Sequence, residues 1–171
     1  KIELIVIGGT WSYLPKEYKY WYIKECFKAA NDFDKKAGHE RTKVENYKAN
    51  YKFENLQKAL LSEQKKNEKA KYKMIGVTLE TRPDYINEKE LLEMRELGCT
   101  RVEMGVQAID DKILKLNKRG SGVTDITRAT KLLKNYGFKV TYHVMPGLPG
   151  STPKKDYEKL YFKEIKKYKH Y

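Results

Sequence analysis

Residues 74–106 read MIGVTLETRPDYINEKELLEMRELGCTRVEMGV, and this stretch decides the expected fold. An apolar run over 74–79 predicts a strand, Asn87 and Gly98 bracket a predicted helix, and residues 100–106 predict a second strand. Parallel strands need a long crossover connection, and a helix between two strands supplies one. The stretch therefore indicates an α/β protein with a parallel sheet.

The same alternation continues on both sides of this stretch. Residues 2–7 and 138–144 are further apolar strand patterns, and helical patterns cover residues 15–32, 55–71, 109–116, 124–136 and 153–168. Because the strand runs are continuous, we expect strands that are buried on both faces. The pattern fits a doubly wound sheet as well as a section of a β/α barrel. Four such units cannot close an eight-stranded barrel, so we expect residues 1–171 to be the core of a longer protein.

Composition excludes several classes of protein. With 40% hydrophobic and 12% aromatic residues in 171, the chain is not a disordered tail. It lacks a run of about 18 apolar residues, and it opens on a strand pattern rather than a leader peptide, so we expect no membrane contact and a cytoplasmic location. A net charge of +13 is typical of a polyanion binder, but also of a lysine-rich thermophile surface.

The two cysteines, Cys26 and Cys99, lie far apart and outside any C-x-x-C motif. A secreted disulfide scaffold would have a denser set. We expect both to be reduced core thiols, since free cysteine behaves as a small hydrophobic residue.

Gly8, Gly9 and Thr10 follow the first predicted strand. Two glycines allow a ligand to approach the backbone and can direct N–H groups at a carboxylate or phosphate. A tight strand-to-helix turn would explain the same residues without any ligand.

Acidic side chains stand at the ends of two neighbouring predicted strands. Glu80 and Glu103 each lie in an apolar context, where an unpaired carboxylate is costly to bury. They therefore point into a cavity, bind a ligand, or pair with a cation, for which Arg82 and Arg101 are candidates.

Further polar groups gather at the same ends of the predicted strands. Gln107 is four residues after Glu103, which puts both on one strand face. His143 ends the last strand and offers a titratable ring, although a lone histidine also serves as a structural residue. Parallel α/β folds place their sites at these strand ends.

Five stretches, taken together, resemble one known family. They are KIELIVIGGT (1–10), TLETRPDY (78–85), CTRVEMGVQ (99–107), NKRGSGVTDI (117–126) and GFKVTYHVMPGLPGST (137–152). In this order they resemble the radical S-adenosylmethionine (SAM) domain of the catalytic Elongator subunit. The resemblance implies a partial parallel β/α barrel of the radical SAM type that holds a [4Fe-4S] cluster and SAM. It also implies an enzyme that uses acetyl-CoA to build a carboxymethyl-type group at C5 of wobble uridine 34 in tRNA.

The resemblance also implies roles for individual residues. The loop formed by Gly8, Gly9 and Thr10 would face the methionine amino group of SAM. Lys1, just before the first strand, would contact acetyl-CoA. The remaining SAM contacts would come from the later strand ends, namely Glu80, Glu103, Gln107, His143, Met145 and Gly147.

One departure from the family concerns the cluster. The three cluster cysteines of the family lie upstream of the first strand, and neither Cys26 nor Cys99 matches them. The acetyltransferase domain would follow Tyr171. We therefore expect the cluster-binding segment and the acetyltransferase site to lie outside this chain, and the chain alone to be inactive.

Expected partners are tRNA and acetyl-CoA, with other Elongator subunits as candidates. The lysine-rich face of the last helix, including Lys159, Lys163 and Lys166, would bind RNA, unless it is only a solvated outer face. Two alternatives remain open from the sequence. One is another radical SAM enzyme that acts on a small molecule, and the other is a non-catalytic basic RNA-binding module.

Overall fold

The computed structural model describes residues 1–33, 46–48 and 51–158. Its strands are β1 (Ile2–Val6), β2 (Met74–Thr81), β3 (Arg101–Gln107) and β4 (Lys139–Val144). They form one parallel sheet in the order β1-β2-β3-β4. A doubly wound sheet reverses its strand order in the middle, whereas a β/α barrel adds each strand beside the previous one. The observed order is therefore that of a barrel section, which confirms the α/β class.

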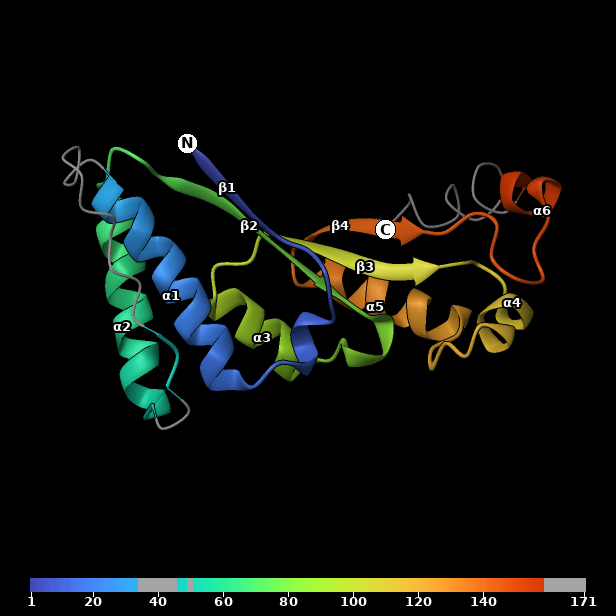
Figure 1. Cartoon of the computed structure of the whole chain (residues 1–171), viewed down its shortest axis with the longest axis horizontal. Coiled ribbons are helices and arrows are strands. Elements are labelled where there is room, and N and C mark those ends of the chain that lie inside the picture. Colours follow the sequence, from blue (N-terminus) through green and yellow to red (C-terminus); the bar gives the residue numbers. More distant parts are fainter. Residues whose placement is uncertain (34–45, 49–50, 159–171) are drawn as a thin grey trace.

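The helices gather on one side of the sheet. Figure 1 shows α1, α3 and α5 against one face, with α2 packed outside α1, while no described helix covers the opposite face. None of the described helices is long and apolar enough to cross a membrane. The bounds are α1 (Lys16–Asp32), α2 (Phe53–Asn67), α3 (Glu88–Glu96), α4 (Asp111–Leu116), α5 (Val123–Asn135) and α6 (Pro153–Tyr157), with short 3-10 turns η1 (Trp11–Tyr13) and η3 (Pro83–Tyr85).

The core lies between the sheet and the helices. Leu79, Val102 and Met104 of the central strands have no exposed surface, and neither have Leu91 of α3 and Leu133 of α5. Alternate residues of a strand point to opposite faces, so the residues between these apolar ones lie on the uncovered face. The helices therefore cover the apolar face, and Glu80 of β2 and Glu103 of β3 are left on the open face.

The expectation of strands buried on both faces is wrong at the edge of the sheet. Residues 76–79 of β2 are buried, but β1 alternates between exposed and half-buried positions. Ile5 is 52% exposed, and Ile7, just beyond the strand, is 65% exposed. A continuous apolar run reports the hydrophobicity of a strand, whereas its burial also depends on which elements cover it. No described element covers this face of β1.

Local signals in the sequence set the helix ends. The Asn87 side chain caps α3 by accepting a hydrogen bond from the Glu90 N–H at 3.0 Å. Gly98 follows α3 with φ of +82°, a conformation that glycine adopts without steric cost. Both residues bracket the helix as predicted. The last predicted helix is described only over α6, and its remainder lies outside the described residues.

A buried ion pair joins α1 to α3. Lys19 is 3% exposed, and its ammonium group pairs with Glu93 and lies 3.6 Å from Glu90. The next residue, Tyr20, donates a hydrogen bond from its hydroxyl to Glu96 at 2.5 Å. Burial, followed by the hydrogen bond to Glu96, raises the pKa of Tyr20 far above its usual value, so the phenol stays protonated. These contacts fix the first helix against the third.

We expect Lys19→Met to lower the free energy of unfolding by about 3 kcal/mol, because it leaves buried carboxylates without their cation. Urea unfolding measures this loss. Lys58→Met, at an exposed position of α2, is the matched control and should stay within about 0.5 kcal/mol. Equal losses for the two variants would show that the buried pair does not stabilise the fold.

Candidate functional site

A chain of polar contacts crosses the open face of the sheet at the strand ends. Glu80 and Glu103 are register partners on β2 and β3, and His143 is opposite Gly105 on β4. His143 Nε2 lies 2.8 Å from Glu103 Oε2, and His143 Nδ1 lies 3.8 Å from Glu80 Oε1. The other Glu80 oxygen accepts a hydrogen bond from the Gly8 N–H at 3.1 Å. Three strands and the loop after β1 thus meet at one polar site, here called the strand-end site.

Arg82 was a candidate cation for these carboxylates, but it does not pair with them. Arg82 binds Asp84 instead, through its Nε at 3.0 Å and its Nη2 at 2.8 Å. The group that lies between Glu80 and Glu103 is His143. Its two ring nitrogens face the two carboxylates, Nδ1 toward Glu80 and Nε2 toward Glu103. The Glu103 side chain is only 12% exposed, and His143 is its contact on the open face of the sheet.

Gln107 completes the site through an unusual backbone. The ladder between β3 and β4 shifts after Gly105, and Gln107 has φ of +66°, which non-glycine residues adopt at a cost. A Cβ at Gly105 would lie 3.3 Å from the Gln107 Nε2 and 3.5 Å from the Arg119 Nη2. The amide and the guanidinium therefore both lie over Gly105, on the same face as Glu103.

Arg119 is a member of the site that sequence reasoning missed. Its Nη2 donates to the Gly105 carbonyl at 2.9 Å. Burial, with a smaller effect of Arg82, lowers the pKa of the Arg119 guanidinium from its usual value. Among the described residues, neither Arg119 Nε nor Gln107 Oε1 has a hydrogen-bond partner, although both atoms are buried. The only signal was the arginine within NKRGSGV, and nothing in its spacing directs it to β3.

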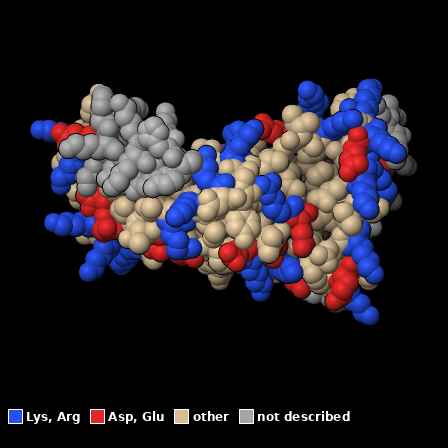
Figure 2. Space-filling view, turned by 180° about the vertical axis from the view of Figure 1, so that it is seen from behind, with Lys and Arg blue, Asp and Glu red and all other residues tan. Residues whose placement is uncertain are grey.

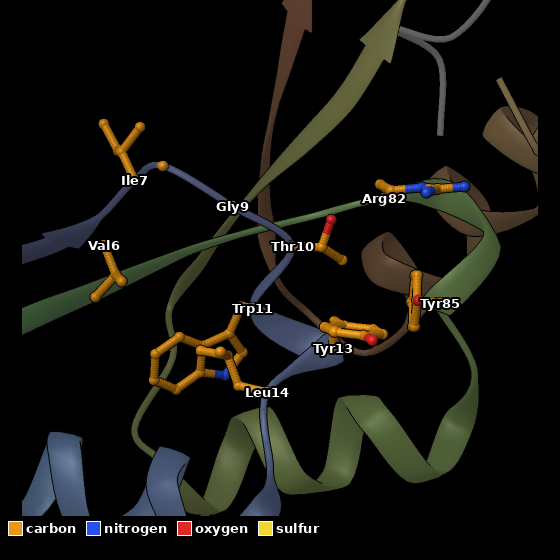
Figure 3. Close-up of a pocket in the computed structure, with 10 residues that line it drawn as sticks. Val6, Ile7, Gly9, Thr10, Trp11, Tyr13, Leu14, Arg82 and Tyr85 are labelled. Atoms are coloured by element: carbon orange, nitrogen blue, oxygen red, sulfur yellow. The ribbon is translucent and has the colours of Figure 1, made fainter. Parts of the chain in front are cut away.

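The glycine loop lies beside a pocket of about 530 Å³. Gly8, Gly9 and Thr10 form part of its wall, and Figure 3 shows the Thr10 side chain among the residues that surround it. Gly8 has φ of +117°, whereas Gly9 lies outside the left-handed region, and a Cβ at either position would meet no atom within 4 Å. The backbone of this loop therefore borders open space on the side of the pocket, which a tight turn alone does not require.

The loop after β4 carries the remaining predicted contacts. Met145 is 52% exposed, and its N–H donates to the Gln107 carbonyl at 2.8 Å. Gly147, with φ of +79°, donates its N–H to Asp156 at 2.8 Å, and the Ser151 hydroxyl also contacts Asp156. The Ser151 and Gly147 hydrogen bonds lower the pKa of Asp156. Asp156 thus closes this loop, a role that its position in the sequence does not indicate.

Other predicted site residues lie elsewhere. Lys1 is exposed at the amino end of β1, at the far end of that strand from Gly8. Lys159, Lys163 and Lys166 lie outside the described residues.

The cysteines do not form a metal site. Burial raises the pKa of Cys26 to about 11 and that of Cys99 to about 12, so both are thiols at neutral pH. Cys99 is a buried core residue as predicted, whereas Cys26 is only half-buried on α1. Within the described part of the chain, no cluster of histidine, cysteine and carboxylate side chains could hold a metal ion.

Basic and acidic side chains are mixed on the surface. Figure 2 shows Lys and Arg at several separate places on one face, with Asp and Glu between them. On that face, the described basic side chains are therefore not gathered into a single patch.

The strand-end site fits a polar organic cofactor. Its buried Gln107 Oε1 and Arg119 Nε lack partners within the described residues, and buried polar groups are normally satisfied. It offers carboxylates for hydroxyl or ammonium groups, an amide, and an open glycine backbone. These groups suit the ribose, amino and carboxylate parts of a nucleoside amino acid such as SAM. They do not suit an iron–sulfur cluster, which takes thiolate ligands.

Comparison with known proteins gives consistent findings. A family model for the radical SAM superfamily matches residues 46–161. The chain is 46% identical over 165 residues to a tRNA uridine(34) acetyltransferase of Methanocaldococcus infernus. This match covers 96% of this chain and 26% of that protein. It is 35% identical over 160 residues to human Elongator complex protein 3, and this match covers 94% of this chain and 25% of that protein.

A solved structure agrees in fold. The archaeal Methanocaldococcus infernus Elp3 with an N-terminal deletion (1–46) superimposes with a TM-score of 0.74 at 43% identity, over 92% of this chain and 32% of that one. The chain thus spans about a quarter of the length of the curated relatives that it matches.

The two glycines of the loop should respond differently to substitution. We expect Gly8→Ala to lower the free energy of unfolding by about 1 to 3 kcal/mol, because alanine is strained at φ of +117°. Gly9→Ala should change it by less than about 0.5 kcal/mol, since its Cβ enters open space. Urea unfolding of both variants measures the difference. Two equally stable variants would mean that the loop relaxes and that the Gly8 conformation imposes no constraint.

Proposed function

This chain belongs to the radical SAM superfamily, and we propose that it is the cofactor-binding core of an enzyme that modifies wobble uridine 34 of tRNA. The full-length enzyme would use SAM, a [4Fe-4S] cluster and acetyl-CoA to build a carboxymethyl-type group at C5 of the uridine. The observation that carries this reaction is the 46% identity, along 96% of the chain, to a protein named tRNA uridine(34) acetyltransferase. A relative named Elongator complex protein 3 supports the same substrate class.

In this proposal the strand-end site binds SAM. The open backbone of Gly8 and Gly9, with Thr10, receives the methionine amino group, to which Glu80 adds a negative charge nearby. Glu103 and Gln107 hold the ribose and adenine from the end of β3. His143, at the end of β4, lines the adenine side together with Met145 and Gly147 of the loop that Asp156 closes. Arg119, whose Nη2 is bound to the Gly105 carbonyl, adds a positive charge beside these residues.

When bound, SAM and a reduced [4Fe-4S] cluster supply a carbon-centred radical. The residues of this chain orient the cofactor and exclude water from one side of it. The thiols of Cys26 and Cys99 are protonated and lie away from the strand-end site, so the cluster ligands would come from another segment of the parent enzyme. Acetyl-CoA, with Lys1 as its contact in this chain, would bind mainly to a downstream acetyltransferase domain.

A non-catalytic RNA-binding module is less well supported. Such a module would have no use for two buried polar atoms near Gly105, Gln107 Oε1 and Arg119 Nε, that lack a hydrogen-bond partner in the described residues. Unsatisfied buried groups cost free energy, and a ligand that binds them removes this cost.

The proposal is tested on the full-length enzyme, reconstituted with its cluster under anaerobic conditions. Purified tRNA is incubated with SAM, acetyl-CoA and dithionite as the one-electron reductant of the cluster, and the nucleosides are analysed by mass spectrometry. We expect a C5-modified uridine only when both cofactors are present. Formation of 5′-deoxyadenosine without any change in tRNA would instead indicate a small-molecule substrate.

Gly9→Val in the full-length enzyme should abolish 5′-deoxyadenosine formation and leave folding unchanged. The branched side chain enters the space where backbone and cofactor meet, but it meets no protein atom within 4 Å of its Cβ. Chromatographic assay of 5′-deoxyadenosine and urea unfolding measure the two effects. Ser62→Val, at an exposed position of α2, is the control and should keep full turnover. Undiminished cofactor cleavage by Gly9→Val would remove the glycine loop from the cofactor site.

A further inference from the structure

One aromatic side chain at the pocket is largely exposed in the described part of the chain. Tyr13, on the turn η1, is 78% exposed and lines the pocket next to the glycine loop. Burial of a tyrosine ring is favourable, so a ring left in water at the mouth of a cavity is available to a ligand. Figure 3 shows Tyr13 and Tyr85 at the same level of the pocket, with the Tyr13 ring directed toward Tyr85.

Arg82 and Tyr85 form another part of the pocket wall. The Arg82 guanidinium lies 5.7 Å from the centre of the Tyr85 ring. Asp84 holds this guanidinium through two hydrogen bonds, of 3.0 Å and 2.8 Å. The aspartate fixes the plane of the guanidinium and also neutralises its charge. This wall therefore suits a flat, uncharged group better than a free anion.

The pocket adjoins the strand-end site. Gly8 and Gly9 line it, and the Gly8 N–H also binds Glu80 of that site. Its volume of about 530 Å³ leaves room for a heterocyclic ring together with its sugar. A group bound there would lie next to the residues that we assign to the cofactor.

We propose that this pocket receives one unpaired RNA base, stacked on Tyr13 and facing the Arg82–Tyr85 wall. Unpaired bases in RNA are recognised mainly by stacking on aromatic rings and on arginine planes, and the pocket presents both. The inference rests on the proposed function, which supplies the RNA, and it adds the residues that hold the base. Tyr13 and Tyr85 are thus substrate-binding residues, and Asp84 is a positioning residue for Arg82.

The test compares two anticodon stem-loops that differ at one position. One carries uridine at position 34 and the other carries an abasic ribose there, so that only the base is removed. Affinities for the full-length enzyme are measured by fluorescence anisotropy at one fixed salt concentration, because phosphate contacts vary with salt. We expect the wild-type enzyme to bind the uridine loop about tenfold more tightly than the abasic loop, which is the size of one stacking contact.

The variants separate the ring from the rest of the surface. Tyr13→Leu should lower the affinity for the uridine loop about tenfold and leave the affinity for the abasic loop unchanged, because leucine is apolar but offers no ring. Tyr13→Phe should restore the discrimination. Phe33→Ala, at a 64% exposed aromatic position after the other end of α1, is the control and should bind both loops as the wild type does.

The outcomes distinguish this inference from the proposed function. Loss of discrimination in Tyr13→Leu with recovery in Tyr13→Phe supports the base pocket. If Tyr13→Leu still prefers the uridine loop tenfold, or weakens both loops equally, the base pocket is overturned while tRNA remains the substrate. If the wild-type enzyme binds neither loop better than an unrelated hairpin, the proposed function fails and the base pocket fails with it.

Discussion

The carboxylate of Glu80 connects parts of the chain that are far apart in sequence. One oxygen accepts the Gly8 N–H from the loop after β1, and the other lies 3.8 Å from His143 at the end of β4. A carboxylate this close to the core needs such partners, since burying it alone is costly. The requirement fixes the direction of the glycine loop and the orientation of the imidazole. The pocket beside Gly8 and the polar edge beside Glu103 both depend on it.

The polar site exists because the two faces of the sheet differ. On β2, Leu79 packs against the helices, and the next residue, Glu80, points to the open face. On β3, Val102 and Glu103 repeat this arrangement in register. Because successive side chains of a strand point to opposite faces, the apolar ones pack against the helices, and Glu80 and Glu103 lie together on the other face. The sheet order β1-β2-β3-β4 then brings the polar ends side by side.

The sequence predicts the elements well and the side-chain partners less well. Strand and helix positions follow from periodicity and from local signals such as Asn87 and Gly98, which act over a few residues. The position of Glu103 follows from alternation along β3. The pairing of Arg82 with Asp84, instead of a strand-end glutamate, depends on side-chain geometry that no periodicity encodes. Arg119 was missed for the same reason, because its contact with Gly105 depends on how the segment after α4 folds back.

The outer edges of β1 and β4 have a consequence for handling the protein. Both strands are terminal in the described sheet, so each presents unused backbone donors and acceptors along one side. Next to the first edge, Ile5 and Ile7 add exposed apolar surface. Natural proteins protect such edges because they pair readily with strands of other molecules, which leads to aggregation. Within the described residues, these two edges are therefore the places where a strand of another molecule can add to the sheet.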